Sequence, residues 1–355
     1  MTKYHYCLLL MGSLLLGSCQ SVEQLSIDYM LPAEVSFPAT LKRVAVVNIT
    51  EEEQKKSENE VARLTNYYNG DAAITTESLA EALANENYFE EVVICDSALR
   101  SKDINPREST LSRDEVLELT QNLDVDFLIA LENIQMRSNR KISYMPDWGV
   151  FLGTVDVKVY PTVRIYLPNR KGPMVTVNSN DSIFWEEAGN GEASVRSRLI
   201  SEEDMVKQAS EFAGTVPVRH LLPYWKTSNR YLFSGGSVNM RDAAVYAKEE
   251  NWSKAVELWK QTYETKKGKQ KMYAAYNTAL GYEMQDSIDT ALEWALKAQT
   301  LAREKSKTDK KETGEIHDGT ISYYIFISMY VDELEKRKEG MARLNMQMNR
   351  FDDDF

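Results

Sequence analysis

Residues 42–49 have the sequence Lys-Arg-Val-Ala-Val-Val-Asn-Ile, and this short run decides how the first half of the chain is organised. A β-branched, apolar run of this length is typical of a strand that is buried on both faces. Charged residues flank it: Lys42 and Arg43 lead into it, and an acidic segment follows at 51–60. We therefore expect a buried strand here.

Helical and extended patterns alternate after this strand. Asp71 is a plausible N-terminal cap for an apolar 3.6-residue pattern that continues to Ala84. Ser112 and Glu115 have the spacing of a capping box at the start of a second helix. Short apolar runs at 92–94 and 127–131 follow the two helices. The order strand, helix, strand, helix, strand predicts an α/β sheet.

The pattern changes to a period of two beyond residue 150. Val155, Val157 and Val159 alternate with polar residues, and residues 168–173 contain the Pro and Gly of a turn. A helix is expected from about 202 to 220. The N-terminal domain is therefore predicted to be α/β or α+β: βαβαβ, then an antiparallel meander and a helix.

The order of these elements resembles a group of envelope lipoprotein domains. Residues 43–48 fit the x-V-A-V-x-N first strand of that group, and residues 124–129 fit its acidic turn into a strand. The group includes lipoproteins of the curli export channel, lipoproteins that activate penicillin-binding proteins, and the amino-terminal domain of the Tol-system β-propeller protein. The resemblance concerns topology only and implies no catalytic residue. An unrelated α+β fold is the alternative.

The first nineteen residues have the pattern of a lipoprotein signal. Lys3 supplies the positive start, residues 7–16 are apolar, and Gly17 and Ser18 precede Cys19. We expect cleavage before Cys19 and its modification by lipid, including an acyl chain such as palmitate. An ordinary signal peptide with an incidental Cys19 is the alternative. Gln20, rather than Asp, follows the cysteine, which favours the outer membrane. Residues 20–22 lack the acidic run that promotes surface export, which favours the periplasmic face.

The last third of the chain is helical and repeats itself. Tyr246, Ala255 and Trp259 have counterparts 36 residues later, and Ala243, Ala279 and Ala298 fit positions where small residues allow helices to touch. This region resembles the tetratricopeptide repeat, which implies stacked helix pairs. A plain helical bundle is the alternative. Residues 316–335 are expected to form a capping helix.

These patterns define six segments. They are a signal peptide (1–18), a lipid-anchored tether with an edge strand (19–40), the α/β domain (41–233), a linker (234–237), the helical repeats with their capping helix (238–340) and a tail (341–355). In this arrangement the tether keeps the α/β domain near the membrane, and the repeats beyond the linker are free to reach a partner.

Several classes of function have no support in the sequence. The formal net charge is −12 and no basic stripe is present, which argues against nucleic acid as a partner. His220 and His317 have no neighbours at zinc-ligand spacing, and no nucleophile or phosphate-binding motif is found. We therefore predict no catalytic residues, no metal and no cofactor, and a protein that is not an enzyme.

The inner surface of the predicted repeats is the best candidate for a binding site. Aromatic and amide side chains on a concave helical surface suit an envelope protein or peptide as partner. The alternative is that its tyrosines simply cover the core. The candidate residues are Met240, Ala244, Lys248, Tyr273, Tyr276, Asn277 and Glu283.

The sequence thus favours a non-enzymatic, lipid-anchored envelope protein that binds a protein partner, with a role in envelope assembly or regulation. A sensor of a small ligand, such as a cell-wall fragment or a nucleotide, is the first alternative. An envelope hydrolase is the second, and it requires a pocket with two acids, or with an acid and His220.

Overall fold

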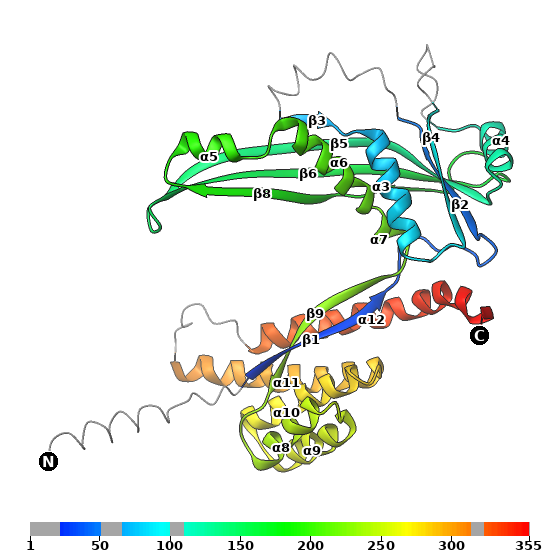
Figure 1. The fold of residues 1–355 in the computed structure, drawn as a ribbon. Helices are drawn as coiled ribbons and strands as arrows, with labels where there is room; N and C mark the ends of the chain where they lie inside the picture. The colour runs from blue at the N-terminus through cyan, green and yellow to red at the C-terminus, as the bar shows by residue number, and fades with distance from the viewer. Residues whose placement is uncertain (1–21, 51–65, 100–109, 314–322, 355) are drawn as a thin grey trace. The chain divides into compact units, whose positions relative to one another are not determined.

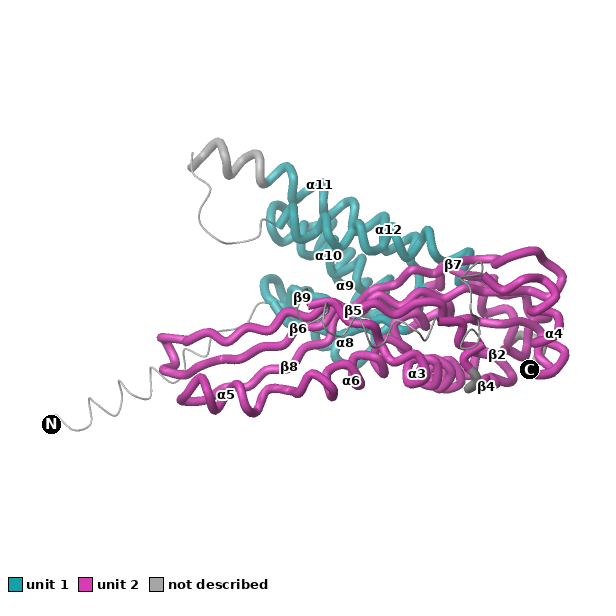
Figure 2. The backbone as a smooth tube through the Cα atoms, turned by 90° about the horizontal axis from the view of Figure 1, so that it is seen from above, with its two compact units in different colours: residues 1–31, 225–344 teal, residues 32–224, 345–355 magenta. Residues whose placement is uncertain are grey.

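The computed structural model describes residues 22–50, 66–99, 110–313 and 323–354, and the chain divides into two compact units (Figures 1 and 2). The sheet unit comprises residues 32–224 and 345–355. The helical unit comprises residues 1–31 and 225–344. The predicted mixture of a sheet-rich N-terminal region and a helical C-terminal region is confirmed in these terms.

The sheet unit is built on a mixed sheet of seven strands. The path through the sheet is β4-β2-β5-β6-β7, with β3 also paired to β5 and β8 also paired to β6. β2 lies parallel to β4 and β5, whereas the other pairs are antiparallel. The strands are β2 (Arg43–Asn48), β3 (Tyr67–Asn69), β4 (Glu91–Ala98), β5 (Phe127–Met145), β6 (Val150–Tyr166), β7 (Val175–Asn178) and β8 (Asp181–Gly189).

Helices cover both faces of this sheet at its parallel end. Because successive strand residues point to opposite faces, Val44 and Val46 of β2 enter one core while Ala45 and Val47 enter the other. α3 and α6 cover the first face, and α4 covers the second (Figure 1). The helices of the unit are α3 (Ala72–Asn85), α4 (Arg113–Leu123), α5 (Glu192–Arg198), α6 (Glu202–Thr215) and α7 (Val218–Leu221).

Most local predictions for this unit are confirmed. Asp71 caps α3, and Ser112 with Glu115 forms the expected capping box on α4. The strand expected at 127–131 is longer than predicted, since β5 continues to Met145 and pairs with β6 along its whole length. The helix expected at 202–220 is interrupted at Pro217, where α6 has ended and α7 has not begun.

The helical unit combines two strands with helices. Ser26 donates to Asn229, and Thr227 donates to Asp28, so the cross-strand partners run in opposite order and β1 and β9 form an antiparallel ribbon. No helix in the described part of the chain is long and apolar enough to cross a bilayer. The elements are β1 (Val22–Leu31), β9 (Tyr224–Phe233), α8 (Val238–Lys248), α9 (Trp252–Thr265), α10 (Gly268–Glu283), α11 (Ile288–Thr313) and α12 (Tyr323–Met348).

The β1–β9 ribbon changes the predicted organisation of the chain. The alternation expected around Ile27 and Tyr29 is present, and both side chains are buried. However, β1 belongs to the helical unit and not to the sheet unit. Residues 234–237, expected to be the linker, also lie inside the helical unit, because β9 before them pairs with β1. The division falls after Tyr224 instead.

The C-terminal residues form part of the sheet unit, although a tail was predicted for 341–355. α12 extends to Met348, and a 3₁₀ helix, η2 (Asn349–Asp354), follows. The Gln347 side chain is buried: its Oε1 accepts from the Ala33 amide at 3.0 Å, and its Nε2 donates to the Val35 carbonyl at 2.8 Å. These bonds satisfy backbone groups outside regular structure, which explains why the segment is packed.

Candidate functional site

A side chain of α10 binds the main chain at the end of β9. The Phe233 amide donates to Oδ1 of Asn277 at 3.0 Å, and Nδ2 of Asn277 donates to the Phe233 carbonyl at 2.8 Å. Asn277 is fully buried. Its carboxamide therefore supplies both bonds that a neighbouring strand would supply, and this pairing does not depend on which side chain the strand carries at that position.

The Phe233 ring occupies an aromatic pocket on the same helix. It stacks on Tyr273 with ring centroids 4.0 Å apart and an angle of 12° between the rings. Tyr276 meets it edge-on at 5.3 Å. The Tyr273 and Tyr323 hydroxyls lie 2.7 Å apart and connect this pocket to the start of α12. Aromatic packing therefore adds side-chain selectivity to the main-chain contact.

Arg230, three residues earlier on β9, forms a buried ion pair with Glu283 at the end of α10. Its Nε and Nη2 donate to the two carboxylate oxygens, each at 2.8 Å. Arg337 Nη1 and the Tyr330 hydroxyl donate to the same carboxylate at 2.7 and 2.8 Å. The Glu283 side chain is 0% exposed, so these bonds replace its entire hydration.

A second carboxylate, Glu333 of α12, completes the charge network. Arg230 Nη1 donates to it at 2.9 Å and the Ser228 hydroxyl at 2.8 Å. The Tyr29 hydroxyl of β1 also donates to Glu333, and Lys226 lies 3.2 Å from it. The network therefore joins both strands of the ribbon to α10 and α12.

The network shifts the ionisation of its members. Burial alone raises the pKa of Glu333, but hydrogen bonds from Tyr29 and Ser228 and the charge of Arg230 outweigh burial and lower this pKa to about 2. Burial lowers the pKa of Arg230, but the hydrogen bond and charge of Glu283 exceed that effect and raise it above its ordinary value. Burial also raises the pKa of Tyr330 well above its ordinary value. Glu333 and Arg230 therefore stay charged, and Tyr330 stays a donor, at neutral pH.

The predicted groove residues lie close together, but β9 fills the surface that they form. Those on α10 contact β9 directly, and Lys248 forms an ion pair of 2.8 Å with Glu23 of β1. Met240 and Ala244 are buried in the core of the helical unit, so they line no open groove. Cys19 lies outside the described residues. The four residues on α10 are Tyr273, Tyr276, Asn277 and Glu283.

Sequence reasoning missed the strand that occupies this surface. Residues 224–233 contain aromatic residues, Thr and an alternation of polar and apolar side chains near Leu232, which together favour a strand. No local sequence pattern indicated the partners of Glu283, because Arg230 and Arg337 are separated from it by 53 and 54 positions. Long-range charge pairing cannot be detected from local periodicity.

Neither the adjacent acids Glu186 and Glu187 nor the His220–Glu34 contact forms the buried pair that the hydrolase alternative requires. Adjacent residues of β8 point to opposite faces, so Glu186 and Glu187 diverge. His220 Nδ1 lies 2.8 Å from Glu34, but the Glu34 side chain is 68% exposed. Among the described residues, no group of three or more Cys, His, Asp or Glu side chains is arranged to hold a metal ion.

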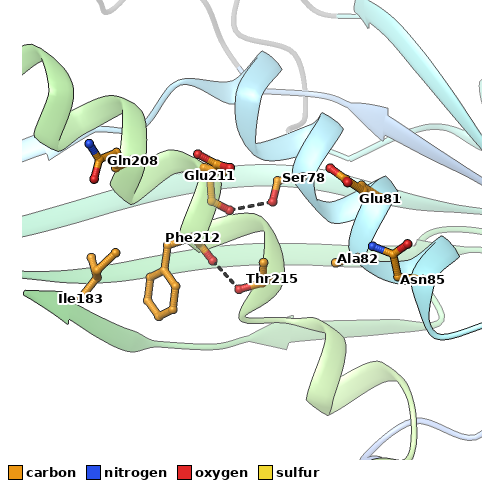
Figure 3. Close-up of a pocket in the computed structure, with 9 residues that line it drawn as sticks. All are labelled: Ser78, Glu81, Ala82, Asn85, Ile183, Gln208, Glu211, Phe212 and Thr215. Atoms are coloured by element: carbon orange, nitrogen blue, oxygen red, sulfur yellow. Dashed lines mark hydrogen bonds between the residues drawn. The ribbon is translucent and has the colours of Figure 1, made fainter.

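A separate groove of about 490 Å³ lies between α3 and α6 of the sheet unit (Figure 3). α3 contributes Glu81, α6 contributes Glu211 and Phe212, and β8 contributes Ile183. Its size falls within the range of small-molecule sites. Trp185 of β8 donates from Nε1 to Gln208, which also lines the groove, at 3.0 Å. The remaining lining residues are Ser78, Ala82, Asn85 and Thr215.

Comparison with family models assigns the sheet-rich region to a family. The model described as "Domain of unknown function (DUF8603)" matches residues 41–233, which is more than half of the chain. The chain belongs to this family. A second model, described as "Domain of unknown function (DUF6340)", matches residues 241–336. No curated protein matches the sequence. The DUF8603 match ends at Phe233 and thus includes β9, the strand that α10 holds.

Replacing Glu283 with Gln should strongly destabilise the protein. The variant leaves Arg230 and Arg337 buried without the shared carboxylate, and breaking a buried pair typically costs about 3–5 kcal/mol. Urea unfolding of the full chain measures the loss. The matched control is Glu23→Gln, which removes a more exposed pair with Lys248 and should cost less than about 1 kcal/mol. Equal losses in the two variants would show that the network does not stabilise the fold.

Protonation of Glu333 should lower the free energy of unfolding in acid. Its pKa is about 2 in the folded chain against an ordinary 4.5, so the unfolded chain binds the extra proton first. The contribution is therefore complete above about pH 4.5 and is lost as pH falls toward the folded pKa. Between about pH 5 and pH 3 the unmodified chain should lose more unfolding free energy than Glu333→Gln does. Glu335→Gln, an exposed change on the same helix, should follow the unmodified chain; parallel curves for all three proteins would contradict the assignment.

Proposed function

We propose that this protein is a non-enzymatic lipoprotein of the cell envelope, anchored by Cys19, that binds a protein partner through its helical unit. In this proposal α8–α11 are two tetratricopeptide-like helix pairs and α12 is their capping helix. Ala243, Ala279 and Ala298 are fully buried, which supports close helix contacts at the expected positions. A Cβ on Gly281 of α10 would lie 2.4 Å from Val256 of α9, so these two helices approach closely.

The observation that carries the proposal is the way α10 holds β9. Asn277 binds the main chain of an extended segment, and Tyr273 stacks on its aromatic side chain. Main-chain hydrogen bonds combined with a pocket for a side chain are a recurring way of binding an extended peptide. Because the chain's own strand already occupies the inner surface, we place the partner on the exposed surface beside it.

We call this neighbouring region the β9–α12 surface. Tyr231 of β9 packs edge-on against Phe326 of α12, with ring centroids 5.3 Å apart. Ile325 and Met329, one helical turn apart on α12, are 54% and 63% exposed. Aromatic and methionine side chains are enriched in protein interfaces, which supports a protein as the occupant. The surface consists of Tyr231, Tyr323, Ile325 and Met329.

The proposed anchor would hold the start of β1, and with it the helical unit, next to the membrane. β1 begins at Val22, three residues after Cys19, and such a segment spans at most about 11 Å. β1 is a strand of the helical unit. An outer-membrane position on the periplasmic face and a role in envelope assembly or regulation remain part of the proposal.

A second candidate function is the binding of a small ligand, such as a cell-wall fragment or a nucleotide. The groove between α3 and α6 supports it, because the groove combines an adequate volume with polar and aromatic side chains. Its two carboxylates, Glu81 and Glu211, favour a fragment with a positive charge over an anionic nucleotide. An envelope hydrolase has less support, since His220 and Glu34 pair at the surface.

Lipid attachment should depend on Cys19 alone. In cells grown with an alkyne-tagged palmitate, the wild-type protein should become labelled and Cys19→Ser should not. The Cys19→Ser variant should also leave the membrane fraction. Cys95→Ser is the matched control, because Cys95 is a free, partly exposed cysteine of the described chain. Labelling that persists in Cys19→Ser would reject the proposed anchor.

Partner binding should map to the β9–α12 surface. A photo-reactive amino acid at Met329 should cross-link one discrete envelope protein in intact cells, and Ile325→Asp in the same chain should abolish that adduct. The control position is Val245 on α8, which is 53% exposed but lies outside this surface. An adduct of equal yield from Val245, or none from Met329, would contradict the proposed docking surface.

A further inference from the structure

α3 and α6 pack tightly against each other beside the groove that lies between them. A Cβ on Gly214 of α6 would lie only 2.6 Å from the Thr75 carbonyl oxygen of α3, so the helices touch there. Thr75 donates to the Ser210 carbonyl at 2.9 Å, and Ser78 donates to the Glu211 carbonyl at 2.7 Å. These bonds fix the two helices against each other, and the groove is therefore preformed.

Two carboxylates from opposite helices stand along this groove. Figure 3 shows Glu81 on α3 and Glu211 on α6, with Ser78 between them. No cationic side chain of the described residues pairs with either carboxylate. Other carboxylates of the same unit do have partners: Asp181 lies 3.0 Å from Arg219, and Glu187 lies 3.3 Å from Arg198. The groove thus has negative charge that the described chain leaves uncompensated.

The rest of the groove suits a hydrocarbon chain. Phe212 and Ile183 are partly buried and lie near each other in Figure 3, apart from the two carboxylates. Carboxylates at one part of the groove and apolar side chains at another favour an organic ammonium compound, whose charged group pairs with the acids while its hydrocarbon part contacts Phe212 and Ile183. Asn85 and Gln208 offer further hydrogen-bond acceptors.

We propose that this groove binds a small organic cation of the aminoalkyl class. Its ammonium group contacts Glu81 and Glu211, and its alkyl chain lies along Phe212 and Ile183. A metal ion is the poorer occupant, because the described residues include no group of three or more ligating side chains, whereas an ammonium group needs fewer partners. The inference rests on the small-ligand function proposed above for this groove, and the site lies in the sheet unit, apart from the proposed partner surface on the helical unit.

Isothermal titration of the full chain with 1,5-diaminopentane tests this assignment. The diamine should bind, whereas 1-pentanol, which has the same chain length and no charge, should not. Glu81→Gln and Glu211→Gln should each weaken binding about tenfold, because each removes one charge-assisted hydrogen bond. Both residues are exposed, so the fold should tolerate the change.

Glu77→Gln is the matched control. Glu77 is an exposed acid on the same helix α3, but it does not line the groove, and its removal changes the net charge by the same amount. Affinity of Glu77→Gln within about twofold of the unmodified chain supports a defined site. A loss as large as that of Glu81→Gln would instead mean diffuse attraction to an acidic protein and would overturn the proposal. Absence of diamine binding, or equal binding of 1-pentanol, would overturn it as well.

Discussion

The helical unit depends on the buried ion pair between Arg230 and Glu283. Removing two charges from water is expensive, and a pair with both side chains below 5% exposure persists only when its hydrogen-bonding groups are satisfied. Arg337 and Tyr330 complete the bonds to Glu283. The pair also fixes the register of β9: a shift by one residue would turn Arg230 to the opposite face of the ribbon. Because Arg230 is fixed, Phe233 meets Asn277 three residues later.

This constraint makes the helical unit discontinuous in sequence. β1 and β9 pair across a separation of 203 residues, measured at Ser26 and Asn229, and residues 32–224, most of the sheet unit, are encoded between them. Closing such a loop has an entropic cost that only the completed ribbon offsets. The helices can begin to form from local contacts. Their packed state needs both β1 and β9, which come before and after most of the sheet unit in the sequence. Non-local pairing of this kind slows folding.

The same distinction explains what the sequence could predict. The first strand, the Asp71 cap and the Ser112–Glu115 capping box depend on neighbouring residues, and all three are present as predicted. Asn277 was predicted to bind a partner from its place in a helical pattern, and in the structure its side chain binds the chain's own β9. The packed C-terminus was not predictable either, since Gln347 binds backbone more than 300 positions away. Local periodicity determines elements, and long-range hydrogen bonds determine which elements meet.

The occupied inner surface also limits how a partner can bind. A strand of the same chain is present at an effective concentration on the order of millimolar, so a free peptide competes poorly for Asn277. Displacement would additionally leave the Glu283 carboxylate buried without Arg230, a cost of about 3–5 kcal/mol. A partner that adds to the ribbon and to Tyr231 and Met329 meets neither obstacle. For the proposed partner, the energetics therefore favour docking beside β9 over exchange with it, and β9 would be a fixed part of the proposed binding surface.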